Sequence, residues 1–344
     1  MLVYFATVVR CAPIARSGEL VQLDWTRKSV LARQPLVPVN PAVEHDPNPR
    51  GGTRGGRGVL VNGHEVIAAS YHSLHVFTRD LEPVRQISHG LFTNLHELAW
   101  DGDAIWVTST GVEAALKIDR DGNVIESWWA TEDPEIVTRF GLSPEKIDKT
   151  QDVRLRFAMA SVANGAPDQV HLNAVAVQGN RPLVLLNRLG CLVRLKPTEI
   201  VFQDPSIRGC HNVLVTRSGQ LIVNDSHHRA IRVFEPSGRC IRTIDLEPLP
   251  PVQRLLERHL VTRMKFWLRK HGRPERVFKP LFRNPQAAKP IWVRGLCETP
   301  RGTILVGISP ATILELDVET GKLLDSFTFS RDLKVCIHGL SCAS

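Results

Sequence analysis

The chain has 344 residues with 43 Lys and Arg, 35 Asp and Glu and 43% hydrophobic residues, which gives a formal net charge of +8. This composition is ordinary for a packed globular protein and excludes the collagen-like and intrinsically disordered classes. No stretch of the sequence approaches the roughly 20 apolar residues of a membrane-spanning helix.

The N-terminal region predicts three short strands rather than a targeting segment. Its first apolar run, from Leu2 to Val9, has no preceding charge and is too short for a signal peptide. The runs ELVQLDW and SVLARQPLV follow it, bounded by turn residues. The seven cysteines show no CxxC spacing, so we expect reduced cysteines, no zinc-finger framework and a cytoplasmic protein.

After a loop rich in Pro, Gly and Arg (39–57), five segments share one pattern. A basic residue or a His opens a short apolar run, and polar turns with Gly or Asp separate it from further apolar runs. The segments begin at Arg57, His96, His171, His211 and Arg294. Four short strands per unit, recurring about every 40 residues, are typical of propeller blades.

The C-terminal sequence IHGLSCAS, from Ile337, repeats only the opening strand of such a unit. The three N-terminal strands lack an opening strand, so joining the two ends completes a sixth blade and leaves no unpaired blade. The sequence therefore predicts an all-β fold, a six-bladed β-propeller in which residues 1–344 form one domain closed by a hybrid blade. A β-sandwich with coincidental strand spacing is the alternative.

Two long connections, 130–169 and 246–292, contain helical patterns, and we expect them to form a small cap over one mouth of the central channel. In the second connection, these apolar residues recur at helical spacing: Val252, Leu255, Leu256, Leu260, Met264, Trp267 and Leu268.

The second connection is also strongly basic, with eleven Lys and Arg and two Glu between Pro248 and Trp292. A lid helix that packs its apolar stripe on the propeller is the first interpretation. Weak contact of residues 248–290 with an anionic membrane is the alternative. We expect no specific nucleic-acid binding, because the run lacks a reader motif.

Two resemblances accompany the repeats. The segment GQLIVNDSHHRAIRVFEPSGRCIRTI, from Gly219, resembles an NHL repeat, the unit of many six-bladed propellers. LHELAW (95–100) and VHLNAVAV (170–177) are similar to motifs of an uncharacterised bacterial family of six-bladed propellers, although this chain has Ala174 where that family has Gly. The resemblance implies the fold and little function, because propellers host unrelated activities.

The residues that open the inner strands are the candidate site. Inner strands line the channel of a propeller, so equivalent starts place their side chains on one ring near the capped mouth. In ring order these residues are His338, Arg57, His96, His171, His211 and Arg294. Ordinary channel-lining residues bonded to water and backbone are the alternative.

Three consecutive blades present His96, His171 and His211. Three imidazoles converging from neighbouring strands match an open catalytic metal site, so we expect a divalent transition metal, with Zn, Fe and Cu as the candidates. Glu97 follows His96 and is predicted to orient a ligand.

Across the ring, Arg57 and Arg294 flank His338, so they are predicted to bind an anionic group while His338 transfers a proton. The other pocket candidates are His72, a catalytic candidate, and Asn173, Arg188 and Asn212, which we expect to bind substrate. Asn173 and Asn212 have a structural alternative, which is to tie adjacent blades together.

The leading functional prediction is a metal-dependent lyase or hydrolase, or an oxidoreductase if the metal is Fe or Cu, acting on a small anionic substrate. The first alternative is a metal-free His and Arg site for sulfuryl or phosphoryl transfer. The second is a non-catalytic binding scaffold whose ring face docks an acidic partner.

Overall fold

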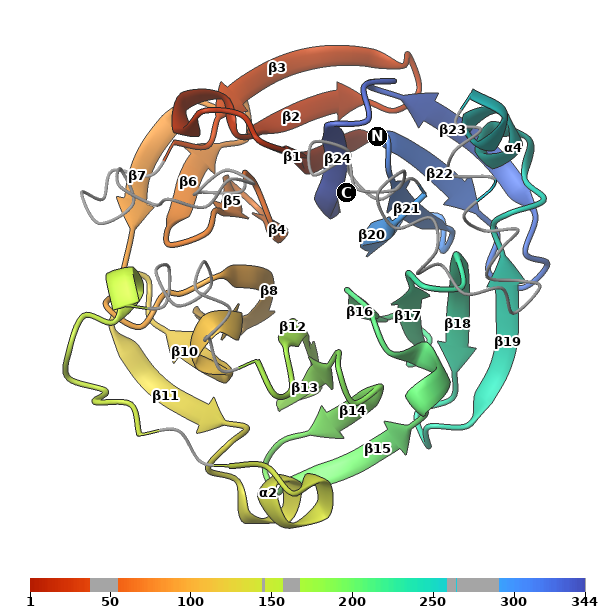
Figure 1. Ribbon diagram of the computed structural model, residues 1–344. Coiled ribbons are helices and arrows are strands. Elements are labelled where there is room, and N and C mark those ends of the chain that lie inside the picture. The colour runs from red at the N-terminus through yellow and green to blue at the C-terminus, as the bar shows by residue number, and fades with distance from the viewer. Residues whose placement is uncertain (38–54, 144–145, 157–167, 259–263, 265–290, 344) are drawn as a thin grey trace.

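The structure is a computed structural model, and it describes residues 1–37, 55–143, 146–156, 168–258, 264 and 291–343. Within these residues, six antiparallel four-stranded sheets stand around a central axis, one after another in chain order (Figure 1). The chain is therefore a six-bladed β-propeller, as the repeats predict.

The first blade contains both ends of the chain. From the axis outward its strands are β24 (Val335–Ala343), β1 (Leu2–Val9), β2 (Glu19–Asp24) and β3 (Ser29–Pro35). The C-terminal strand pairs with the N-terminal strand from Leu2↔Ala343 to Val9↔Val335. This pairing confirms the predicted hybrid blade, and it closes the ring without an unpaired inner edge.

The other five blades each use four consecutive strands, beginning at the axis. Blade 2 is β4 (Val59–Asn62), β5 (Glu65–Ala69), β6 (Leu74–Thr78) and β7 (Pro83–Ile87). Blade 3 is β8 (Leu95–Asp101), β9 (Ala104–Ser109), β10 (Ala114–Ile118) and β11 (Val124–Trp129). Blade 4 is β12 (Leu172–Gln178), β13 (Arg181–Leu186), β14 (Cys191–Arg194) and β15 (Glu199–Gln203). Blade 5 is β16 (Val213–Val215), β17 (Leu221–Asp225), β18 (Ala230–Phe234) and β19 (Cys240–Asp245). Blade 6 is β20 (Val293–Glu298), β21 (Ile304–Ile308), β22 (Thr312–Leu316) and β23 (Leu323–Thr328).

The hydrophobic core lies between neighbouring blades. Ile67 and Leu98 share one cluster between blades 2 and 3, and Val3 and Leu305 share another between blades 1 and 6. Because both faces of a middle strand are covered, β9, β17 and β21 are buried along their whole length. This explains why these strands read as continuous apolar runs rather than alternating ones.

The described helices lie outside the inner strands (Figure 1). Helix α2 (Pro134–Phe140) begins at the Asp133 side chain, which accepts hydrogen bonds from two backbone amides, and ends at Gly141 in the left-handed conformation. Helix α4 (Pro250–Arg258) belongs to the basic connection. Three short 3-10 helices are also present within the described ranges: η1 (Ile14–Arg16), η2 (Thr110–Val112) and η3 (Pro205–Ile207).

Helix α4 buries Val252, Leu255 and Leu256 in the apolar cluster of blades 5 and 6. This part of the predicted stripe packs on the propeller, as the lid interpretation requires, whereas Met264 is exposed. The rest of the stripe, most of the predicted cap and most of the predicted membrane contact (248–290) lie outside the described residues. In the described ranges, no helix is long and apolar enough to cross a membrane.

Candidate functional site

All six residues that open the repeats lie within or just before the inner strands. His338, His96 and Arg294 lie within β24, β8 and β20, and Arg57, His171 and His211 immediately precede β4, β12 and β16. The strand pairing is interrupted by a register shift at His338, at His96–Glu97 and at Arg294–Gly295. A β-bulge redirects the side chains of its strand, so in these three strands the recurring His or Arg of the sequence pattern marks the position of a bulge.

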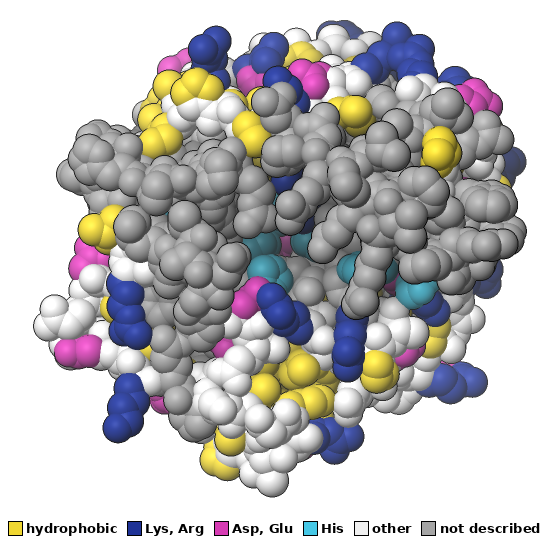
Figure 2. All heavy atoms as spheres, in the orientation of Figure 1, with side chains coloured by type: hydrophobic (Ala, Val, Ile, Leu, Met, Phe, Trp, Pro, Cys, Tyr) yellow, Lys and Arg dark blue, Asp and Glu magenta, His cyan; other side chains and the backbone are white. Residues whose placement is uncertain are grey.

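The structure brings the four histidines of the ring together. The ring centroid of His96 lies 5.4 Å from that of His171 and 5.3 Å from that of His338. His338 also lies 6.0 Å from His211 across the axis. Figure 2 shows histidine side chains gathered in a hollow near the middle of this face.

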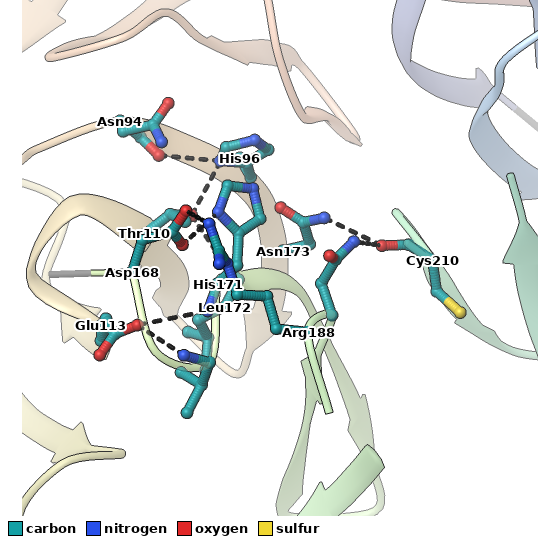
Figure 3. Close-up of polar contacts among 12 residues, drawn as sticks. Asn94, His96, Thr110, Glu113, Asp168, His171, Leu172, Asn173, Arg188 and Cys210 are labelled. Atoms are coloured by element: carbon teal, nitrogen blue, oxygen red, sulfur yellow. Dashed lines mark hydrogen bonds and ion pairs between the residues drawn. The ribbon is translucent and has the colours of Figure 1, made fainter. Parts of the chain in front are cut away.

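Arg57 lies between two of these imidazoles. Its Nη1 atom is 3.0 Å from Nε2 of His96 and 3.0 Å from Nε2 of His338. A guanidinium only donates hydrogen bonds, so both Nε2 atoms accept and both imidazoles carry their proton on Nδ1. For His96 this is consistent with the 2.9 Å contact from Nδ1 to the Asn94 carbonyl oxygen (Figure 3).

The imidazoles of His96, His211 and His338 are neutral at physiological pH. Burial lowers the pKa of each well below 6.5, and the positive charge of Arg57 lowers it further; at His211 and His338 the charge of Arg294 adds to this effect. His338 is 1% exposed, and its Nδ1 atom has no hydrogen-bond partner among the described residues. This buried N–H group is therefore available to a bound molecule.

His171 differs from the other three because a carboxylate supports it. Its Nδ1 atom lies 2.7 Å from Asp168 Oδ1, and Arg188 forms an ion pair with the same carboxylate (Figure 3). Burial opposes ionisation of Asp168, but the bonds and charges of His171 and Arg188 outweigh it and hold the pKa of Asp168 below its usual value. An imidazole held in this way presents the lone pair of Nε2.

The backbone at His171 is also held in an uncommon conformation. Its φ is 51°, in the left-handed region, and a residue there costs of order 1–3 kcal/mol. Glu113 compensates by accepting hydrogen bonds from the backbone amides of Val170, at 2.6 Å, and His171, at 3.3 Å. The buried Glu113 side chain thus fixes where His171 stands.

His211 and Arg294 meet through Trp292. Nε1 of the Trp292 indole lies 3.1 Å from Nδ1 of His211, which is also 2.8 Å from the Gly209 carbonyl oxygen, and the Arg294 guanidinium lies 4.8 Å from the indole centroid. Arg294 has no carboxylate partner among the residues that the structure describes. Burial lowers its pKa to about 10, so the guanidinium keeps its charge at neutral pH.

Below the ring, Glu97 of blade 3 reaches Asn212 of blade 5. The Asn212 amide donates to Glu97 Oε2, while its oxygen accepts from Asn224 and from the Gly295 backbone, both at 2.8 Å. Burial raises the pKa of Glu97 to about 8, outweighing the bonds from Leu98 N and Asn212. The carboxyl group is therefore mainly protonated at pH 7.

Glycine at position 58 makes room for this carboxyl group. A Cβ atom there would lie 2.5 Å from Glu97 Oε1 and 2.9 Å from the His96 carbonyl oxygen. The contact between Glu97 of blade 3 and Asn212 of blade 5 therefore also depends on the absence of a side chain at Gly58 in blade 2.

Two predicted pocket residues have structural roles in this geometry. Asn173 is fully buried, and its amide donates to the Cys210 carbonyl at 2.9 Å, which ties blade 4 to blade 5. Nδ1 of His72 donates to the Phe92 carbonyl at 2.8 Å and links blade 2 to the segment before β8. The blade-tying alternative thus fits Asn173, and Asn212 positions Glu97. Glu97 itself contacts Asn212 rather than the imidazole that it was expected to orient.

The predicted metal ligands do not fit a transition metal as they are placed. Within the described ranges, no group of three or more His, Cys, Asp or Glu side chains is arranged to hold a metal ion. For His96, Nδ1 donates to a carbonyl, so only Nε2 remains for coordination, and that atom accepts from Arg57. A metal there requires Arg57 to leave, so we derive no step through a metal.

Asp168, Glu113 and Trp292 belong to the site but were not predicted from the sequence. Asp168 and Trp292 lie in the long connections between blades, where no repeat fixes their register. Asp168 three residues before His171 is the one local signal that was available, because an acidic side chain at that spacing can reach the ring nitrogen.

No protein-family model and no curated protein matches the chain. Solved structures share its fold. A protein of unknown function from Bacteroides caccae is 10% identical, with 98% of this chain and 97% of that chain covered and a TM-score of 0.57. The nidogen/laminin complex is 10% identical over the same shares, with a TM-score of 0.56. A catalytically inactive virginiamycin B lyase from Staphylococcus aureus is 11% identical, covers 80% of this chain and 70% of its own, and has a TM-score of 0.45. The first two likenesses show the fold alone.

Proposed function

We propose that the ring is the active site of an enzyme that transfers or hydrolyses a phosphoryl or sulfuryl group of a small anionic substrate without a metal. The observation that carries the proposal is the set of contacts around His338. Burial and then the charges of two guanidinium groups, of Arg57 and Arg294, lower its pKa, and its buried Nδ1–H has no partner among the described residues. Such a site gathers positive charge and a buried N–H donor, to which a small anionic group can bind.

The proposed chemistry uses His171 as the nucleophile. Nε2 of His171 attacks the phosphorus or sulfur atom, the bond to the leaving oxygen breaks, and that oxygen takes up a proton. Arg57, Arg294 and His338 stabilise the charge on the transferred group. Water or an acceptor hydroxyl then attacks the group on His171, gives its proton to the Glu97 carboxylate left by the first step and frees Nε2, while Asp168 keeps the imidazole oriented throughout.

Glu97 is the candidate proton donor in this scheme. With a pKa of about 8, its carboxyl group holds a proton at neutral pH and can release it to a leaving group that becomes basic. This matches the general rule that acids in catalysis have a pKa near the working pH.

The metal-dependent lyase or hydrolase predicted from the sequence stays a prediction, as do the cytoplasmic location and the NHL-like family. Metal analysis of the purified protein tests the first directly. Zn, Fe or Cu near one equivalent in the wild type, and its loss in His171→Ala, would favour the metal-dependent enzyme over metal-free phosphoryl or sulfuryl transfer.

The proposal is tested with aryl phosphate and aryl sulfate esters and protein treated with a chelator. We expect turnover to survive chelation and to fall at least about 100-fold in His171→Asn. Asn tolerates the left-handed backbone at this position better than other residues, so this variant removes the nucleophile with the least strain. Rapid quenching of the wild type should trap the group on His171.

Two results would contradict the proposal. Activity that disappears on chelation and returns with added metal assigns the site to metal chemistry. A protein that neither turns over these esters nor binds phosphate or sulfate supports the scaffold alternative, in which the same face binds an acidic partner.

A further inference from the structure

Two cysteines lie side by side where the propeller closes. Cys297 is on β20, the inner strand of blade 6, and Cys342 is on β24, the inner strand of blade 1. Their Sγ atoms are 3.0 Å apart, within the apolar cluster that joins the two blades. All seven cysteines are free thiols.

The geometry is close to that of a disulfide. From the observed separation of 3.0 Å, the bond requires the sulfur atoms to approach by about 1 Å. Cys297 is 8% exposed and Cys342 is half-buried, so a reagent in solution reaches Cys342 first. Burial and the neighbouring thiol raise the pKa of Cys297 well above its usual value, so this thiol is poorly reactive until its neighbour is modified.

We propose that Cys297 and Cys342 are a modification site, at which a low-molecular-weight disulfide such as oxidised glutathione forms a reversible bond between blade 6 and blade 1. The Cys342 thiolate attacks one sulfur of the reagent and releases one glutathione thiol. The Cys297 sulfur then attacks Cys342 Sγ, forms the protein disulfide and releases the second glutathione thiol. Two protein thiols are oxidised and one reagent disulfide is reduced, so protons and electrons balance.

The bond would fasten the strand on which ring closure depends. Besides this pair, β24 contacts blade 6 through packing and through a hydrogen bond from the Ala311 backbone amide to the Val335 carbonyl, and it pairs with β1 as described above. The same two strands carry His338 and Arg294, so the disulfide would fix the relative position of these residues. The inference rests on the thiol geometry alone and stands whether or not the proposed chemistry of the ring is correct.

The experiment uses the full chain, incubated with oxidised glutathione, blocked with N-ethylmaleimide and digested without reduction. We expect a linked peptide pair containing Cys297 and Cys342, and a loss of the free thiols of these two residues that dithiothreitol restores. The oxidised protein should unfold at a temperature about 5 °C higher than the reduced one, because the link closes a long loop of the unfolded chain.

Cys240 and two variants make the result decisive. Cys240 is exposed on blade 5, so its modification by glutathione shows within the same sample that the reagent is active. Cys342→Ser and, independently, Cys297→Ala should abolish the linked peptides and the thermal shift. Modification of Cys240 with no link between Cys297 and Cys342, or a link from either residue to another cysteine, would overturn the proposal.

Discussion

Replacing Glu97 with Gln should stabilise the protein at alkaline pH and change it little at acidic pH. In the folded protein burial raises the pKa of Glu97 from 4.5 to about 8. Between these two values the folded protein binds one more proton than the unfolded chain, so stability falls as the pH rises and is lowest, with respect to this group, above pH 8. Gln has the same shape and carries no charge, so it removes this dependence.

The magnitude follows from the two pKa values. Each tenfold change in proton affinity corresponds to about 1.4 kcal/mol, so a rise from 4.5 to about 8 gives at most about 5 kcal/mol. The Glu97 side chain keeps partial solvent exposure, and water lowers the cost of its charge, so we expect about 3 kcal/mol. For a chain of 344 residues, this corresponds to a melting temperature about 4 °C higher than that of the wild type at pH 9.

Calorimetric melting of the wild type and Glu97→Gln at pH 5, 7 and 9 measures this difference. Only the change in the difference between the two proteins is used, because the histidines titrate in both. Glu82→Gln, at an exposed position of blade 2, is the control and should show no trend. A difference between wild type and Glu97→Gln that stays constant from pH 5 to pH 9 would refute the assignment of a protonated carboxyl group beneath the ring.

Three further predictions follow from the same geometry. The pKa values of His96, His211 and His338 are lowered well below 6.5 in the folded protein, so the contribution of these neutral imidazoles to the stability of the fold is complete above pH 6.5 and is lost as the pH falls. Melting below pH 6.5 should therefore show proton uptake on unfolding, and His338→Gln should reduce the number of protons taken up. Gly58→Ala should lower stability by about 1–3 kcal/mol through overlap with Glu97, whereas Gly63→Ala, where a Cβ meets nothing within 4 Å, should not; urea denaturation compares the two. Arg294→Met should weaken binding of inorganic phosphate or sulfate by about 10- to 100-fold in titration calorimetry, with the exposed Arg239→Met as the control, and equal affinities in the two variants would contradict the role of Arg294.

The fold was predictable because each blade repeats a pattern that the physics of a propeller requires. Middle strands that are covered on both faces must be apolar throughout, and the turns between them must be polar or contain Gly, so the repeats are visible in a single sequence. The closing strand could be found for the same reason, since the sequence from Ile337 repeats the opening strand and nothing else. The position of a residue within its repeat then fixed its place on the ring.

The contacts between ring residues were less predictable, because they depend on side-chain directions at the bulges. The sequence places Arg57 and His96 at equivalent positions, but it does not show that the guanidinium contacts the imidazole atom that a metal would need. Nor does it show that Glu97 passes its neighbour in blade 4 to reach Asn212 in blade 5. That crossing depends on the small residue at position 58, whose importance is visible only once the blades are placed around the axis.

The arrangement of charges links anion binding to protonation at this site. Burial keeps His338 neutral, and Arg57 and Arg294 add to this because they would repel a third positive charge. An anion bound between the two guanidinium groups would cancel much of that repulsion, so it would raise the pKa of His338 and favour a proton on the imidazole. By reciprocity, protonation of His338 would strengthen the binding of the anion. Anion binding and uptake of a proton by His338 are therefore coupled, and the added positive charge would help to stabilise the transferred group in the phosphoryl or sulfuryl transfer proposed above.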